Sequence, residues 1–178
     1  RIADLGCGTG LCGEHLHRYS GRLIGVDLSE GMLKEAQKKN VYDELHTKDI
    51  IQYLQTQKSS IDAIIAADVF VYVGALEKVF QAVSTSLKEN GWFIFSIETS
   101  AKEGFTLTNS GRFAHSFNYI STLASKYGLH FIETKNLNVR MEAGNPLPGI
   151  LFILQHTPPN KGKPIHSAEA TFQQALAQ

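Results

Sequence analysis

The chain is short of cysteine and of charge, and it lacks a long apolar run; each shortage excludes a class of protein. Its two cysteines, Cys7 and Cys12, lie in one glycine-rich stretch, which matches neither a disulfide framework nor a Cys-x-x-Cys metal knuckle. Basic and acidic residues number 17 each, so no net charge attracts nucleic acid or an anionic membrane. No apolar run reaches the ~18 residues that span a bilayer, and no signal peptide is evident. We therefore expect a cytoplasmic protein without a metal site.

The composition predicts one folded domain. Of the 178 residues, 43% are hydrophobic, which supplies a substantial core and excludes disorder throughout. We expect this domain at residues 1–156, and we expect an N-terminal portion to be absent, because the chain starts inside a predicted strand. Residues 157–178 are expected to form a linker, rich in proline and lysine, and a terminal helix.

Glycine is concentrated just after the first predicted strand. That strand ends in Asp4, glycines follow at positions 6, 8, 10 and 13, and an amphipathic helix is predicted from Leu11 to about Tyr19. Glycines let the backbone turn sharply from strand to helix and lie close against a ligand. The start of the helix offers free N–H groups. The stretch therefore predicts a nucleotide-binding turn.

Two cofactors suit such a turn. Residues 8–13 match the dinucleotide fingerprint Gly-x-Gly-x-x-Gly, and Asp27, at the end of the next predicted strand, is placed to bind a ribose. Asp4 favours a different ligand, because a carboxylate beside the first glycine repels a pyrophosphate but attracts an ammonium and a sulfonium. S-Adenosylmethionine carries both of these groups. It is the expected cofactor, with NAD as the alternative.

The order of Asp4, Gly6, Gly8 and Gly10 resembles the Asp-x-Gly-x-Gly-x-Gly signature of the class I S-adenosylmethionine-dependent methyltransferases. The resemblance extends from residue 1 to about residue 156. It implies methyl transfer as the activity and S-adenosylmethionine as the cofactor. It also implies the following cofactor-binding residues: Asp4, Gly6, Cys7, Gly8, Thr9, Gly10, Asp27, Leu28, Asp49, Ile50 and Asp68.

Two further runs, at 25–33 and 111–116, resemble predicted methyltransferases that are joined to tetratricopeptide repeats. The predicted helix at 168–178 is similar to one helix of such a repeat, a plain terminal helix being the alternative. This resemblance implies a protein partner that binds through flanking helical repeats.

Individual roles follow from the positions of the cofactor residues. Asp27 is expected to accept hydrogen bonds from the two ribose hydroxyls, a helix cap being the alternative. Leu28 and Ile50 are expected to sandwich the adenine, unless they are ordinary core residues. Asp49 is expected to contact the adenine amino group or to cap the following helix. Asp68 resembles the acidic residue that the family often has near the methionine end of the cofactor.

Predicted strands and helices alternate along the chain. This spacing is typical of a doubly wound α/β protein, and we expect a mostly parallel, seven-strand Rossmann-like sheet. No helix separates the last two predicted strands, so the last strand is expected to be antiparallel, and ligands are expected at the carboxyl ends of the strands. After the first strand, strands are predicted at 22–27, 44–48, 61–68, 92–98, 129–137 and 149–156, and helices at 11–19, 29–40, 50–57, 76–87 and 117–127.

His115 is the candidate general base. It lies just after the predicted loop that follows the fifth strand, and a base near neutrality helps when the methyl acceptor is a hydroxyl or an amine. A helix cap and a surface histidine are the alternatives, and methyl transfer that depends on positioning alone needs no base. Tyr72, Asp68 and Glu98 are expected to line the acceptor pocket. Arg112 is a candidate anchor for an acidic acceptor.

The acceptor is expected to be a small molecule that takes the methyl group on oxygen or nitrogen. No Asn/Asp-Pro-Pro-Tyr follows the fourth predicted strand, which argues against a flipped nucleobase, and the balanced charge argues against a large RNA surface. A protein side chain as acceptor stays an alternative. A non-catalytic S-adenosylmethionine-binding module and an NAD-binding oxidoreductase domain are alternatives of other classes.

Overall fold

The computed structural model describes residues 1–142 and 145–157. Its helices are α1 (Leu11–Leu16), α2 (Glu30–Lys38), α3 (Ile50–Gln55), α4 (Glu77–Ser86) and α5 (Phe117–Lys126), with short 3-10 helices at His17–Tyr19 and Phe70–Tyr72. Its strands are β1 (Ile2–Leu5), β2 (Leu23–Asp27), β3 (Glu44–Thr47), β4 (Ile61–Ala66), β5 (Leu87–Glu98), β6 (Phe105–Leu107), β7 (Phe113–His115), β8 (Leu129–Glu142) and β9 (Asn145–His156). The predicted linker and terminal helix lie outside the described residues, apart from Thr157.

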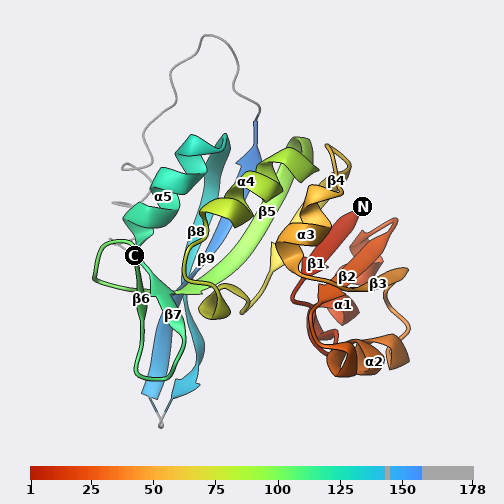
Figure 1. Ribbon diagram of the computed structural model, residues 1–178, viewed down its shortest axis with the longest axis horizontal. Helices are drawn as coiled ribbons and strands as arrows, with labels where there is room; N and C mark the ends of the chain where they lie inside the picture. The colour runs from red at the N-terminus through yellow and green to blue at the C-terminus, as the bar shows by residue number, and fades with distance from the viewer. Residues whose placement is uncertain (143–144, 158–178) are drawn as a thin grey trace.

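Seven of these strands form one sheet, in the order β3-β2-β1-β4-β5-β9-β8 (Figure 1). The five strands β1 to β5 are parallel, whereas β9 is antiparallel to both of its neighbours. Helices α3, α4 and α5 lie over one face in Figure 1. Right-handed crossovers from β1 to β2 and from β2 to β3 place α1 and α2 on the opposite face. The predicted doubly wound, seven-strand fold with an antiparallel last strand is therefore confirmed.

The last two strands are longer than predicted. Residues 146–148 were expected to connect them, but they belong to β9, where Pro146 pairs with Met141 and Pro148 with Asn138. Pairing between β9 and β5 ends at Gly149, so both prolines lie where β9 has a neighbour on one side only. A proline is tolerated there because its missing N–H breaks no bond to a second strand.

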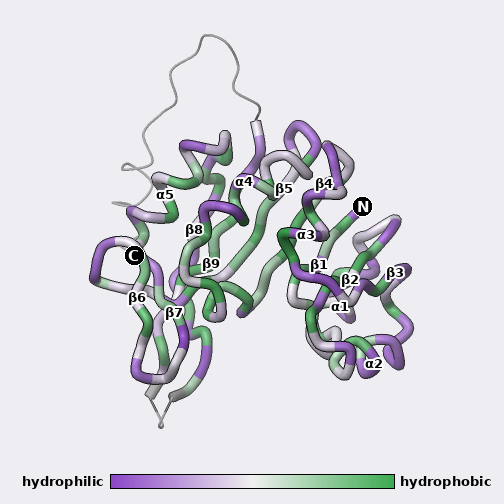
Figure 2. Tube along the Cα trace, viewed as in Figure 1, coloured by the Kyte–Doolittle hydropathy of each residue, from purple (hydrophilic) through white to green (hydrophobic). Residues whose placement is uncertain are grey.

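The core lies between the sheet and the helices of the α3, α4 and α5 face. Apolar residues dominate the central strands, while hydrophilic residues concentrate on the outer helices and loops (Figure 2). Aromatic rings fill the core beside β5: Phe93 and Phe95 stack with centroids 4.5 Å apart, and Phe80 packs edge-on against both. This apolar layer stabilises the strands whose carboxyl ends carry the polar residues of the candidate site.

The segment between β5 and α5 was predicted as a loop, but it contains the antiparallel pair β6 and β7. Each strand has three residues, too few for an alternating pattern to be recognised. A bridge between Thr99 and His115 joins β7 to the end of β5. In Figure 1 the β6–β7 and β8–β9 pairs both extend beyond the carboxyl end of β5. Within the part of the chain that the structure describes, no helix has the length and apolarity to cross a membrane.

Candidate functional site

A cavity of about 590 Å³ lies at the carboxyl edge of the sheet. Among the predicted cofactor residues, Asp4, Cys7, Thr9 and Gly10 do not line it. The residues that line it follow β1, β2, β3 and β4: Gly6, Gly8, Asp27, Leu28, Ser29, Met32, Asp49, Ile50, Asp68, Val69, Tyr72 and Val73. Seven of the eleven predicted cofactor residues therefore lie in the wall of this cavity.

The strand order fixes how these residues follow one another along the edge. Because neighbouring strands in the sheet are β3, β2, β1 and β4, the sequence along the edge is Asp49, Asp27, the glycine turn and then Asp68 with Tyr72. A long ligand lying across the strand ends would meet the aspartates and glycines in this order. This is the switch point of the sheet, where strand order reverses and open α/β proteins bind ligands.

The glycine turn has the backbone that a close ligand requires. Gly6 and Gly8 adopt positive φ angles of 62° and 54°, which are strained for other residues. A Cβ on Gly6 would lie 2.7 Å from Cγ2 of Val69, whereas nothing lies within 4 Å of a Cβ on Gly8. The space at Gly8 is therefore open for a ligand rather than filled by the protein.

Asp27 holds the turn and remains able to bind a ligand. One carboxylate oxygen accepts a hydrogen bond from the Gly8 N–H at 2.9 Å, and the other accepts from the Ser29 N–H at 2.8 Å. The alternative role as a helix cap is wrong, because the side chain of Ser29 caps α2 by accepting from Met32 N. Each carboxylate oxygen keeps a second acceptor position, which suits a diol.

Asp49 and its neighbours form the far end of the cavity. Oδ1 of Asp49 accepts from the N–H groups of Ile51 and Gln52, so the capping alternative is confirmed, and Oδ2 is left to face a ligand. Ile50 is only 9% exposed and belongs to the core, as its alternative predicted, although it also lines the cavity. Leu28 is 71% exposed. An apolar side chain so exposed beside a cavity is suited to cover a flat ring.

Asp68 occupies a strained backbone position at the other end. Its φ is 56°, a left-handed value that is uncommon outside glycine, and its N–H donates to Oγ of Ser96 at 3.0 Å. Such strain persists only where surrounding contacts fix it, and it concentrates at functional sites. The exposed Asp68 carboxylate thereby lies in the cavity wall.

Asp4 lies beneath the glycine turn rather than in the cavity. It is 1% exposed, and Oδ2 accepts a hydrogen bond from the Tyr42 hydroxyl at 2.6 Å. The Tyr42 ring fills the space that glycines leave, since a Cβ on Gly13 or Gly25 would approach it to 2.5 Å and 3.0 Å. Sequence reasoning missed Tyr42; the glycines at 13 and 25 were the one signal that a bulky side chain packs there.

Burial sets the titration of this cluster. It raises the pKa of Asp4 from 3.8 to about 6, the Tyr42 hydrogen bond opposes the shift, and the charge of Asp27 adds to it. Burial also raises the pKa of Cys7 to about 12 and that of Cys12 above its usual range. Both thiols are therefore protonated at neutral pH and are not nucleophiles.

His115 is buried in β7 and does not line the cavity. Its Nε2 lies 3.0 Å from the carbonyl oxygens of both Val73 and Gly74 and therefore carries the proton, while Nδ1 is buried without a partner among the described residues. Both alternatives are wrong, because Ser116 caps α5 and the imidazole is not at the surface. Burial lowers the pKa of His115, which favours the neutral ring.

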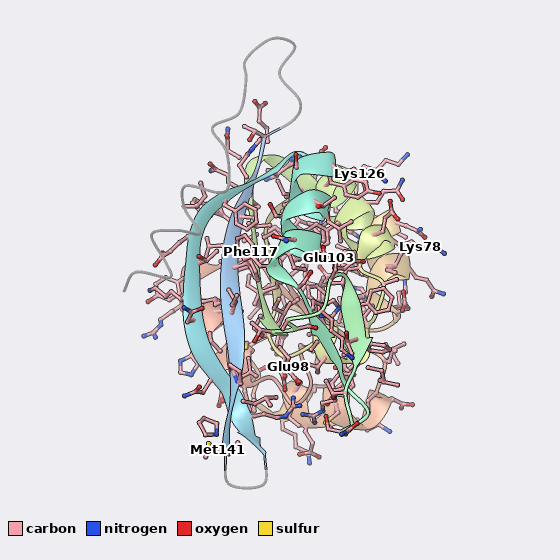
Figure 3. All side chains as sticks on the ribbon, turned by 90° about the vertical axis from the view of Figure 1, so that its left-hand side faces the viewer. Lys78, Glu98, Glu103, Phe117, Lys126 and Met141 are labelled. Atoms are coloured by element: carbon pink, nitrogen blue, oxygen red, sulfur yellow. The ribbon has the colours of Figure 1, made fainter. Side chains whose placement is uncertain are left out.

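Glu98 is also buried, at the end of β5, where Figure 3 shows it between the β6–β7 and β8–β9 pairs. It forms an ion pair with Arg140 of β8. Glu98 was expected to line the acceptor pocket, but it is absent from the cavity wall and its charge is paired. Tyr72 does line the cavity and is 65% exposed.

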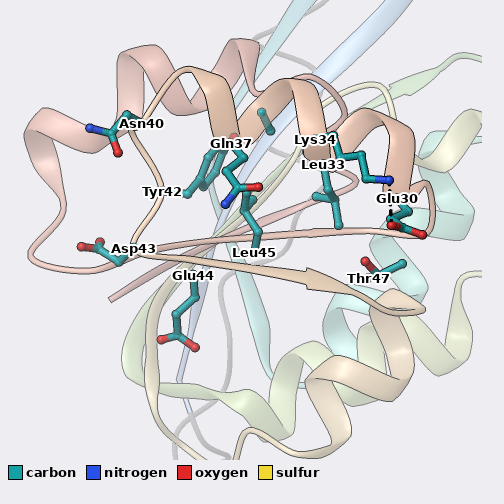
Figure 4. Close-up of a pocket in the computed structure, with 11 residues that line it drawn as sticks. Glu30, Leu33, Lys34, Gln37, Asn40, Tyr42, Asp43, Glu44, Leu45 and Thr47 are labelled. Atoms are coloured by element: carbon teal, nitrogen blue, oxygen red, sulfur yellow. Dashed lines mark ion pairs between the residues drawn. The ribbon is translucent and has the colours of Figure 1, made fainter.

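A second cavity of about 420 Å³ lies between α2 and β3, on the outer side of the sheet edge (Figure 4). Polar side chains surround it, among them Glu30 and Lys34, which pair with each other at 2.9 Å. No predicted cofactor residue lines it, so the cavity at the strand ends is the candidate site. No cluster of metal-ligating side chains occurs among residues 1–142 and 145–157.

Known proteins resemble this chain in sequence and in fold. A family model described as "Methyltransferase domain" matches residues 3–95, more than half of the chain. The chain belongs to the methyltransferase domain family. It is 34% identical over 99 residues to the biotin biosynthesis bifunctional protein BioHC of Saccharophagus degradans, a match that covers 54% of this chain and 18% of that protein.

Two further relatives are a sequence match and a solved structure. Ubiquinone biosynthesis O-methyltransferase of Hydrogenovibrio crunogenus is 27% identical over 99 residues, covering 53% of this chain and 41% of that protein. The structure of magnesium protoporphyrin IX methyltransferase from Synechocystis with bound SAH matches with a TM-score of 0.70 at 19% identity, covering 88% of this chain and 73% of that one. The methyltransferase domain thus spans less than half of the curated relatives named here.

The cofactor of the domain is S-adenosylmethionine, and the residues present fit it. Gly8 leaves open space against the turn, Asp27 offers two oxygens to a diol, and Asp49 keeps a free oxygen. The three aspartates of the wall, Asp27, Asp49 and Asp68, give the cavity a negative character that suits a sulfonium and an ammonium and opposes the pyrophosphate of NAD.

The buried charge of Asp4 yields a prediction for stability. Because the pKa of Asp4 is raised in the folded state, the protonated carboxyl adds fully to the stability of the fold below pH ~4. This stabilisation is lost as the pH rises through about 6. Asp4→Asn, which keeps an acceptor for Tyr42, should therefore be more stable than the parent at pH 8, by about 3 kcal/mol at most. The difference should vanish near pH 4. Urea unfolding across this pH range measures it, and a difference that does not change with pH would contradict the assignment.

Proposed function

We propose that this domain transfers a methyl group from S-adenosylmethionine to an oxygen or nitrogen of a small molecule in the cytoplasm. The observation that carries the proposal is the row of Asp49, Asp27, open glycine turn and Asp68 along one cavity. The names of two relatives, which place them in ubiquinone and biotin biosynthesis, support a small-molecule acceptor. The balanced net charge supports an acceptor other than nucleic acid.

The chemistry rests on positioning. When bound, S-adenosylmethionine supplies an electrophilic methyl group on a sulfonium. The protein contributes by holding the two reactants in line and by excluding water, which converts a bimolecular reaction into one within a complex. Gly6 and Gly8 keep the turn close to the ligand, Asp27 fixes the turn, and the strained Asp68 is directed into the cavity.

The function of His115 as a general base stays a prediction. The geometry limits which of its ring nitrogens could accept a proton. Nε2 is committed to the carbonyls of Val73 and Gly74, so Nδ1 is the one atom able to accept a proton. The same bonds tie β7 to the segment that carries Tyr72 and Val73, two residues of the cavity wall. We therefore propose that His115 chiefly positions this segment.

Other functions are favoured by fewer observations. A non-catalytic binding module would retain the turn without needing an acceptor pocket, and an oxidoreductase would bind NAD in the same turn. Asp68 and the negative cavity oppose NAD. A protein acceptor, recruited through tetratricopeptide repeats, depends on residues 168–178 and on flanking segments.

Binding measurements test the cofactor assignment. Isothermal titration should detect binding of S-adenosylhomocysteine and no binding of NAD. Asp27→Asn should weaken the binding of S-adenosylhomocysteine by roughly tenfold or more, because an amide cannot accept from both Gly8 and Ser29 N–H groups and loses one acceptor for the ribose. Asp62→Asn is the matched control, since Asp62 pairs with Lys88 at the surface and does not line the cavity. Binding of NAD alone would overturn the proposal.

A second experiment separates a base from a positioning residue at His115. Once an acceptor is available, His115→Gln should lower thermal stability and change the acceptor KM, while the maximal rate stays within a few-fold of the parent from pH 5 to 9. A general base predicts instead a fall in maximal rate of about 10²-fold or more, with loss of the corresponding limb of the pH profile. That result would remove the positioning assignment.

A further inference from the structure

Arg112 does not itself line the cavity, but it contacts Tyr72, which is in the cavity wall with Asp68. Arg112 precedes β7, and its guanidinium carbon lies 5.5 Å from the centroid of the Tyr72 ring. One Nη2–H donates to the Tyr72 hydroxyl at 3.3 Å. Because Tyr72 is part of the cavity wall, these two contacts hold a cation at the rim.

This guanidinium differs from the two arginines nearest to carboxylates. Arg22 pairs with Glu44, and Arg140 pairs with Glu98. Among the described residues, no ion pair includes Arg112. A guanidinium has five N–H donors in a planar fork, and the Tyr72 contact uses one. The remaining donors are available to a ligand, and a planar fork matches a carboxylate.

Charge changes sign along the strand ends. Asp49, Asp27 and Asp68 follow one another on the side of β3, β2, β1 and β4, and Arg112 lies beyond Tyr72. A positively charged ligand is attracted to the aspartates. A negatively charged one is repelled by them and attracted to Arg112. The two ends of the site are thereby suited to ligands of opposite charge.

Apolar side chains accompany the cation. Phe105 is 43% exposed and Leu107 is 60% exposed, both on β6, the strand paired with β7. Tyr72 adds the face of its ring. A molecule held at Arg112 would therefore lay an apolar body against Tyr72 and the hairpin.

We propose that the methyl acceptor is a small organic acid, and that Arg112 binds its carboxylate while Tyr72 and the β6–β7 hairpin contact its apolar part. This inference rests on the proposed function, because it assigns the acceptor end of the same site. A carboxylate matches one unpaired guanidinium better than a phosphate dianion does, since a single positive charge balances it. Arg112 is then a specificity-determining residue.

The test measures binding of defined probes to the protein saturated with S-adenosylhomocysteine. The probes are benzoate and octanoate, their uncharged counterparts benzamide and octanamide, and phenyl phosphate. At least one carboxylate should bind about tenfold or more tightly than its amide. Arg112→Gln should reduce the affinity for that carboxylate to the affinity for its amide, and it should leave the affinity for S-adenosylhomocysteine unchanged. Arg112→Lys should give a carboxylate affinity between those of the parent and of Arg112→Gln, because lysine keeps the charge but lacks the planar fork of donors.

Arg18→Gln is the matched control. Arg18 also lies over a tyrosine ring, with its guanidinium carbon 5.1 Å from the centroid of Tyr19, but outside the cavity wall. Its substitution should change no probe affinity. The inference is overturned if neither carboxylate binds better than its amide, if Arg112→Gln has no effect, or if phenyl phosphate is preferred to benzoate. A protein that fails to bind S-adenosylhomocysteine would instead overturn the proposed function, and with it this inference.

Discussion

The hydrogen bond from Tyr42 to the buried carboxylate of Asp4 is the contact on which the cofactor turn depends. It fixes the end of β1 from below, and the Tyr42 ring occupies the space that side chains at Gly13 and Gly25 would fill. The turn above is thereby held against a packed surface while its outer side, at Gly8, stays open. A buried carboxylate costs stability near neutral pH, so its presence here favours a functional reason over a structural one.

The arrangement of charge follows from the order of the strands. Parallel strands place their carboxyl ends at one edge, and the ends of β2, β3 and β4 each contribute one aspartate to the cavity wall, namely Asp27, Asp49 and Asp68. Backbone N–H groups restrain two of them: Asp27 accepts from Gly8 in the turn and from Ser29, the cap residue of α2, and Asp49 accepts from the start of α3. The site is therefore preorganised by the same contacts that end the strands and begin the helices.

Sequence patterns predicted the sheet, its antiparallel last strand and most of the cavity wall, because these depend on local periodicity and on a glycine motif. They did not predict Tyr42, which contacts Asp4 across 38 positions and lies in a connection without a motif. The β6–β7 pair was missed because strands of three residues are too short to show a period, and His115 was consequently expected just after a loop rather than in a strand. The burial of Asp4, Glu98 and His115 could not be predicted either, since it depends on packing between distant segments.

The number of protons released when S-adenosylmethionine binds tests the central claim most directly. A positive ligand beside the turn should lower the raised pKa of Asp4, because charges in a buried environment are poorly screened. Titration calorimetry at pH 6, in two buffers of different ionisation enthalpy, should therefore detect release of a substantial fraction of a proton, and Asp4→Asn should abolish it. Binding without proton release, or equal release by the parent and the variant, would contradict the account.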